Sequence, residues 1–170
     1  GGLQAVFFGG ADPAITNLSP SDISLIGNHI TRPTSWSGVW TTKTIIETKN
    51  ARRLLIEGNV IENVWASGQV GFALLLKSEN QNGTAPWSQS TDLTVRYNRI
   101  RNAGSGFNVA SNPGAYPVVP AARIAIYDNV IENLGISPYN GDGIPLQILG
   151  NTADVVVAHN SWGNAKNMAV

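Results

Sequence analysis

The chain lacks cysteine, has few charged residues and carries no net charge. Its 170 residues include no cysteine, two histidines and 13% charged residues, with a formal net charge of zero. The missing thiols exclude disulfides and thiolate metal sites. A neutral chain offers no electrostatic case for binding nucleic acid or an anionic membrane. No apolar run approaches the roughly 18 residues of a membrane span. The absence of cysteine fits a cytosolic protein or an extracellular bacterial one.

One asparagine recurs five times within the same short apolar pattern. Successive copies are separated by 31, 39, 31 and 31 residues, and the five positions are Asn28, Asn59, Asn98, Asn129 and Asn160. A fixed period in this range indicates a solenoid of stacked repeats. We therefore expect residues 1–170 to form one domain, a segment of a longer solenoid.

Apolar residues alternate with polar ones around each copy. The position five before the asparagine holds Ile23, Leu54, Leu93, Ile124 and Val155. This period of two predicts strands with one buried face, which pair in parallel with the next coil about 4.8 Å away. Third strands are predicted at residues 5–8, 44–47, 72–76, 107–109 and 144–148. The fold class is therefore all-β: a right-handed parallel β-helix of about five coils of about 31 residues, with three parallel sheets.

The asparagines are expected to stack into a ladder inside this fold. Each would occupy a bend between two strands in the left-handed conformation and bond to the same amide one coil away. A second asparagine follows four residues later in the last four copies, at Asn63, Asn102, Asn133 and Asn164, whereas the first copy has Arg32 there. A second ladder is expected to start one coil later than the first.

Charges alternate in sign from coil to coil at aligned positions. Six residues before the asparagine the sequence has Asp22, Arg53, Asp92, Arg123 and Asp154. Three residues after it, Glu62, Arg101 and Glu132 alternate as well, and Glu57 faces Arg96, with Tyr127 next. Opposite charges across paired strands stabilise by roughly 0.2–1 kcal/mol. We interpret these charges as structural, which removes them from the catalytic candidates.

The repeated apolar pattern around Asn59, Asn98 and Asn129 resembles the right-handed parallel β-helix proteins of the pectin-lyase-like superfamily over essentially the whole chain. The resemblance implies extracellular work on acidic or neutral polysaccharides by lyases, hydrolases, esterases or epimerases. It also covers adhesins and phage tail spikes. The family's lyases bind calcium through clustered acids and use an Arg or Lys base. No matching acid cluster is found here, which argues against lyase activity.

Long loops between the predicted strands are the candidate sites, because solenoids carry function on such insertions. Residues 9–22, 77–92 and 110–122 would emerge along one edge, and residues 31–43, 62–71 and 132–143 along the other. Aromatic side chains suited to sugar stacking lie on these loops: Trp36, Trp40, Trp65 and Tyr139 on one edge, Trp87 and Tyr116 on the other. The alternative is that each ring folds back to cover the side of the solenoid.

Three ionisable residues at the ends of predicted third strands are the catalytic candidates. Glu47, Lys77 and Glu79 would lie in adjacent coils beside a long loop. Two carboxylates with a lysine suit a glycoside hydrolase, and a lysine base suits a polysaccharide lyase. The alternative is an inter-coil ion pair between Glu47 and Lys77.

Calcium is the one cofactor that the sequence suggests. Asp142, in the stretch Asn140-Gly-Asp-Gly143, could supply oxygen ligands to it, although such a stretch is more often a turn. His29 and His159 lie four coils apart, roughly 20 Å by the strand spacing, and cannot form one site.

Two functions follow from these observations. The first is an extracellular or cell-surface, bacterial β-helix segment that binds or processes polysaccharide, with this segment alone not expected to be catalytic. The second is a non-catalytic scaffold or adhesin. Neither end carries a polar cap, so we expect its partners to be the remaining coils of a longer chain or an end-to-end copy of itself.

Overall fold

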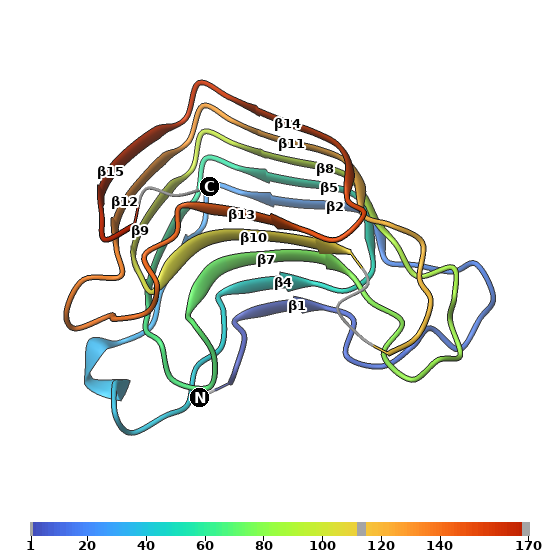
Figure 1. Cartoon of the computed structure of the whole chain (residues 1–170), viewed down its shortest axis with the longest axis horizontal. Helices are drawn as coiled ribbons and strands as arrows, with labels where there is room; N and C mark the ends of the chain where they lie inside the picture. Colours follow the sequence, from blue (N-terminus) through green and yellow to red (C-terminus); the bar gives the residue numbers. More distant parts are fainter. Residues whose placement is uncertain (1, 112–114, 168–170) are drawn as a thin grey trace.

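The computed structural model describes residues 2–111 and 115–167 as five stacked coils (Figure 1). Each coil contributes three strands in a fixed order. The strands are β1 (Val6–Phe8), β2 (Ser21–Ile26) and β3 (His29–Ile30); β4 (Ile46–Thr48), β5 (Ala51–Glu57) and β6 (Val60–Val64); β7 (Phe72–Ser78), β8 (Ser90–Arg96) and β9 (Arg99–Ala103); β10 (Ser105–Ser111), β11 (Ala122–Tyr127) and β12 (Val130–Leu134); β13 (Leu146–Leu149), β14 (Ala153–Ala158) and β15 (Ser161–Ala165). One 3₁₀ turn, η1 (Thr34–Trp36), lies on the loop before β4.

Three parallel sheets of five strands enclose the core. Sheet A contains β1, β4, β7, β10 and β13; sheet B contains β2, β5, β8, β11 and β14; sheet C contains β3, β6, β9, β12 and β15. The predicted parallel β-helix and its coil length are therefore confirmed. Like residues pair in register, as in Leu54 with Leu93 and Ile100 with Ile131. Because side chains alternate between the two faces of each strand, these residues all point inward and pack into one aliphatic core.

The asparagine ladder is present. The first four ladder asparagines each donate their backbone N–H and side-chain amide to the Oδ1 of the asparagine one coil further on, at 2.8–3.0 Å. Asn59, Asn98 and Asn129 are almost fully buried. The second ladder also forms and starts from Asn63, which donates to the Thr31 hydroxyl at 2.9 Å.

The prediction that the ladder asparagine itself adopts the left-handed conformation is wrong. The residue before it does so: Gly27, Gly58, Tyr97, Asp128 and His159 have φ between 52° and 66°. The asparagine amide thus keeps an orientation that bonds along the stack, and its neighbour absorbs the bend. Tyr97 stands out because a bulky side chain in this region is strained by about 1–2 kcal/mol.

The charge ladders pair as the alternation predicted, with one difference. Arg53 contacts Asp22 and Arg123 contacts Asp92, both at 2.6 Å. Arg101 lies beside both Glu62 and Glu132 in the register, but it binds Glu62, and Glu132 receives Arg99 instead. The predicted contact of Arg96 with Tyr127 is confirmed, with a hydrogen bond of 3.0 Å to the phenol oxygen.

Loops gather at the two ends of the sheet A strands (Figure 1). One set follows sheet A and precedes sheet B, and the other follows sheet C and precedes sheet A, as the sequence predicted. Core-facing residues are less covered in the outermost coils, where Ile148 and Val157 are about 40% exposed. Within the described ranges, no helix is long and apolar enough to cross a membrane.

Candidate functional site

The outer face of sheet A, between the two sets of loops, is the candidate site. Because side chains alternate across a strand, one outward row runs over all five coils and comprises Phe7, Glu47, Leu75, Asn108 and Gln147. A hollow of about 370 Å³ opens on this face, with apolar, amide and lysine side chains around it. It is lined by Gln69, Val70, Phe72, Leu75, Lys77, Asn108, Ala110 and Leu149.

Sequence reasoning missed the amide residues of this face. Asn108 Nδ2 donates to Gln147 Oε1 at 2.6 Å, so the two side chains form one polar strip on β10 and β13. Successive side chains of β10 point to opposite faces of the sheet, so Asn108 points away from the core if Phe107 points into it. That signal was available in the sequence, but the strip became visible only when the register joined Asn108 to Gln147.

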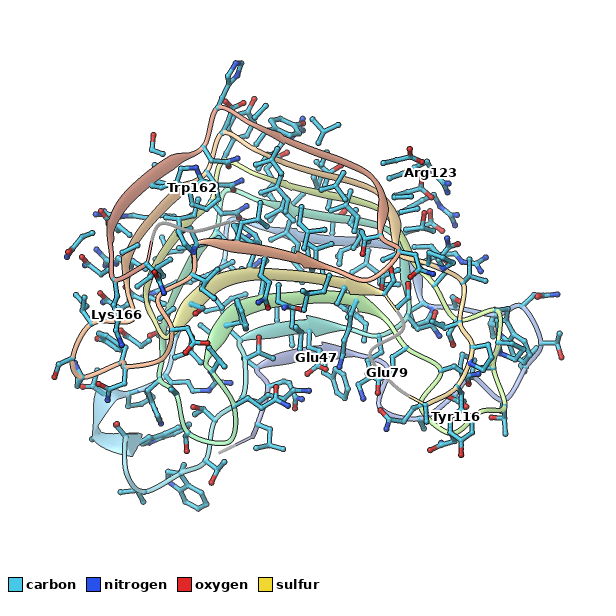
Figure 2. All side chains as sticks on the ribbon, in the orientation of Figure 1. Glu47, Glu79, Tyr116, Arg123, Trp162 and Lys166 are labelled. Atoms are coloured by element: carbon cyan, nitrogen blue, oxygen red, sulfur yellow. The ribbon has the colours of Figure 1, made fainter. Side chains whose placement is uncertain are left out.

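The structure brings the three catalytic candidates together. Lys77 Nζ lies 2.7 Å from Glu79 Oε2 and 3.3 Å from Glu47 Oε1. Figure 2 shows Glu47 and Glu79 near each other beside sheet A, on a different part of the molecule from Arg123. The Glu47–Lys77 pair is thus the inter-coil ion pair that the sequence offered as an alternative to a catalytic site.

Further lysine and amide groups contact the carboxylates of Glu47 and Glu79. Glu47 has no exposed surface and also receives Lys43 Nζ at 2.7 Å and Gln4 Nε2 at 2.8 Å. Glu79 also lies 3.3 Å from Lys49, whose Nζ in turn contacts Gln81. The cluster therefore contains three lysines and two glutamates, and its carboxylates are used to hold the coils together.

The pKa of Glu79 is lowered rather than raised. Burial on its own raises the pKa of this carboxyl, but the hydrogen bond and charge of Lys77 and the charge of Lys49 outweigh burial. Glu79 is therefore ionised at neutral pH. A glycosidase general acid requires the opposite shift, so the environment of Glu79 does not suit that role.

The six candidate aromatic residues do not form one platform. On the edge before sheet A, Trp40 is 49% exposed, Trp36 is half-buried and Trp65 is only 3% exposed. The phenol of Tyr139, also half-buried, donates to Asn63 Oδ1 at 3.0 Å. Trp65 and Tyr139 line a small hollow of about 60 Å³ within these loops. Their rings therefore pack the loop interior.

On the other edge, Trp87 is half-buried and Tyr116 is 46% exposed. Figure 2 shows Tyr116 far out on the loops that follow sheet A. Gly83 lies against the Tyr116 ring, since a Cβ on Gly83 would approach it to 2.8 Å. Trp40 and Tyr116 are thus the exposed rings among the six, and they lie on opposite edges of sheet A.

These loops are tied to one another by Asp12. Its carboxylate accepts hydrogen bonds from the backbone N–H groups of Gln81, Asn82 and Thr84 and from the Thr84 hydroxyl, at 2.7–3.1 Å. Burial raises the pKa of Asp12, but these four hydrogen bonds lower it by more. The loop between β7 and β8, which lengthens the spacing from Asn59 to Asn98 to 39 residues and is called the insertion loop below, is therefore anchored on the loop between β1 and β2.

Asp142, the calcium candidate, is not part of a cluster of acidic or histidine side chains among the described residues. Asp142 is exposed, and among the described residues no three or more His, Asp or Glu side chains gather as a metal site would require. The two histidines are separate, as expected: His29 contacts Glu62 at 2.7 Å and His159 lies 3.6 Å from Asp128.

Comparison with known proteins identifies no relative. No protein-family model matches the sequence. No curated protein and no solved structure matches at a significant level.

Proposed function

We propose that the chain is a non-catalytic carbohydrate-binding β-helix segment of the pectin-lyase-like type, acting outside the bacterial cell or at its surface. Its binding surface would be the outer face of sheet A, between the two sets of loops. The observation that carries the proposal is the hollow of about 370 Å³ that combines an apolar floor with amide groups. Ligand sites typically pair such an apolar lining with a few polar groups.

The residues of this hollow suit the two kinds of surface on a sugar ring. Leu75 and Phe72 can pack against its C–H groups, and Asn108 can exchange hydrogen bonds with its hydroxyls. Lys77 adds one cationic group at the rim of the ion-pair cluster. The outward row continues from Asn108 to Gln147 in the next coil, which suits an extended neutral or weakly acidic polysaccharide.

Binding is favoured over cleavage because the ionisable groups are occupied. Glu47 and Glu79 are each held by two lysines, and Lys77 lies between both carboxylates. The lowered pKa of Glu79 does not suit a general acid. A lysine whose donors face two carboxylates is poorly placed to abstract a substrate proton.

A scaffold or adhesin without a sugar ligand is the second candidate. It is favoured by the pairing of carboxylates between coils, as in Asp22 with Arg53, Glu57 with Arg96 and Glu132 with Arg99. Such pairing between coils uses these carboxylates to stabilise the solenoid.

A glycan array followed by calorimetry on the bound glycans tests the proposal. Leu149 is 47% exposed at the hollow and Val156 is 58% exposed on sheet B of the same coil. We expect Leu149→Trp to weaken binding at least tenfold and Val156→Trp to leave it unchanged. Polysaccharides incubated with the protein should yield no new reducing or unsaturated ends.

Each contrary outcome identifies a different error. An array without bound glycans favours the scaffold. Equal affinity of the two tryptophan variants places the binding surface elsewhere. New chain ends would show that the protein is an enzyme.

A further inference from the structure

Trp40 is the exposed tryptophan of the chain. Its side chain lies on the loop between β3 and β4 and is 49% exposed, whereas the other four tryptophans are buried or half-buried. Tryptophan is highly buried on average in folded proteins. The large ring of Trp40 therefore offers an apolar surface that the fold itself does not use in full.

A closed turn holds Trp40 in place. The carbonyl of Trp36, the last residue of η1, accepts the backbone N–H groups of Val39 and Trp40 at 3.0 and 2.9 Å. One residue earlier in the turn, Ser37 donates its N–H to the Thr34 carbonyl at 3.0 Å. Backbone that is fixed before binding loses less entropy when a ligand binds. The ring is thus attached to a preorganised support.

This turn contacts the rim of the hollow on sheet A. Gly68 donates its N–H to the Thr42 carbonyl at 3.0 Å, and a Cβ on Gly68 would lie 3.0 Å from Thr41 Cγ2. Gln69, the residue after Gly68, lines the hollow. Trp40 directly precedes Thr41, so one contact between neighbouring loops separates the tryptophan from the hollow.

The surface along this contact is exposed and uncharged. Thr41, Ser67, Gly68 and Gln69 are all exposed, and none of them carries a charge. Gly68 has no side chain, so only backbone occupies the middle of the path. Hydroxyl and amide groups lie on either side of it, with an aromatic ring at one end and the apolar hollow at the other. Apolar and hydrogen-bonding surfaces alternate in the way that successive units of a sugar chain require.

The exposed ring on the opposite edge has no such connection. Tyr116 is 46% exposed, similar to Trp40, but it packs on Gly83 of the insertion loop and does not line the hollow. The two rings are therefore matched in exposure and differ in their link to the candidate site.

We propose that Trp40 is a second subsite of the carbohydrate-binding face and stacks on a sugar unit that lies beyond the hollow. Gln69 lies between the two subsites and contacts the units that join them. This inference rests on the function proposed above and narrows its ligand to a linear chain long enough to reach from the hollow to Trp40. A short fragment of the same glycan occupies the hollow alone.

Calorimetry with size-fractionated fragments of a glycan selected on the array tests the subsite. We expect Trp40→Ala to weaken the longest fragments about tenfold, in line with the loss of one aromatic contact, and to leave the shortest binding fragment unchanged. Trp40→Phe keeps a ring and should lose only about threefold. Tyr116→Ala is the matched control and should bind every fragment as the wild type does. Trp40→Gln replaces Trp40→Ala if the latter does not fold.

The contrary outcomes separate this subsite from the hollow. If Trp40→Ala binds long fragments normally while Leu149→Trp still weakens them, the subsite is wrong and the hollow stands. Equal losses for short and long fragments would overturn the subsite, because Trp40 would then act on the hollow itself. Equal losses in Trp40→Ala and Tyr116→Ala would overturn its specificity. A Leu149→Trp variant that binds normally, or an array without bound glycans, would overturn the hollow and the subsite together.

Discussion

Asn98 donates its backbone N–H and its side-chain amide to a single acceptor, Oδ1 of Asn129, at 3.0 and 2.9 Å. Its own Oδ1 receives the same two donors from Asn59. Each side-chain oxygen therefore accepts a backbone N–H at a bend, where the hydrogen bonds between paired strands are interrupted. The ladder is a continuous part of the hydrogen-bonding of the core.

Replacing the central member of this ladder should destabilise the whole stack. Asn98→Leu leaves buried donors on Asn59 without an acceptor, and we expect a loss of about 3 kcal/mol in the free energy of unfolding. Asn28→Leu is the control at the exposed end of the same ladder and should lose about 1 kcal/mol or less. Urea denaturation measures both. Equal losses would mean that the ladder does not stabilise the fold through buried hydrogen bonds.

The ion-pair cluster on sheet A predicts an asymmetry between single and double variants. Lys77→Met leaves Glu47, which has no exposed surface, and Glu79 with one lysine fewer each. We expect the free energy of unfolding to fall by about 3 kcal/mol, because breaking a buried ion pair leaves an uncompensated charge in the interior. The double variant Glu47→Leu, Lys77→Met should recover part of it, since Leu75 and Leu149 already occupy these rows in other coils. Additive losses in denaturation would contradict this reading.

Asp12 should act as a clamp on the insertion loop. Asp12→Ala removes the acceptor for three backbone N–H groups, and amide exchange at Gln81, Asn82 and Thr84 should accelerate at least tenfold. The global free energy of unfolding should fall by only about 1 kcal/mol, because the clamp lies largely at the surface. Hydrogen exchange with residue-level NMR distinguishes local release from global loss. Unchanged exchange at these amides would show that the loop is held by other contacts.

Lowering the pH should decrease the free energy of unfolding. The pKa values of Asp12, Asp22, Glu62, Glu79 and Asp92 are lowered in the folded state, by hydrogen bonds and by the arginine, lysine and histidine partners described above. A carboxyl with a lowered folded pKa contributes its full stability above its unfolded pKa and loses it as the pH falls through the folded pKa. Stability followed by circular dichroism should therefore be maintained down to the ordinary glutamate value of 4.5 and fall below it. A rise in stability below that pH would contradict these directions.

Sequence periodicity was enough to predict the fold, because in a solenoid each coil repeats the same physical problem. The ladder asparagines, the aliphatic rows and the alternating charges all occur at the same offset in successive copies, so local pattern and global contact coincide. The conformation at the bend was missed because Gly27 and Gly58 hold it in two coils, while Tyr97, Asp128 and His159 hold it in the others.

The candidate site was less predictable because it depends on contacts between coils and on burial. The sequence placed Glu47, Lys77 and Glu79 in one region but did not predict that Lys43, Lys49 and Gln4 also converge on their carboxylates. Aromatic residue type did not distinguish Trp65, packed inside its loop, from Trp40 at the surface. The Asn108–Gln147 strip required the register of β10 on β13.

The central functional claim is that the outer face of sheet A binds carbohydrate at the hollow bordered by Asn108. Its most direct test is an NMR titration of the labelled protein with a glycan selected on the array, observing the side-chain amides of Asn108 and Gln147. We predict that these two amide signals shift and saturate together, while the side-chain amide signal of Asn59 in the ladder does not move and no new chain ends form. A glycan that binds without shifting either amide of the Asn108–Gln147 strip would contradict it.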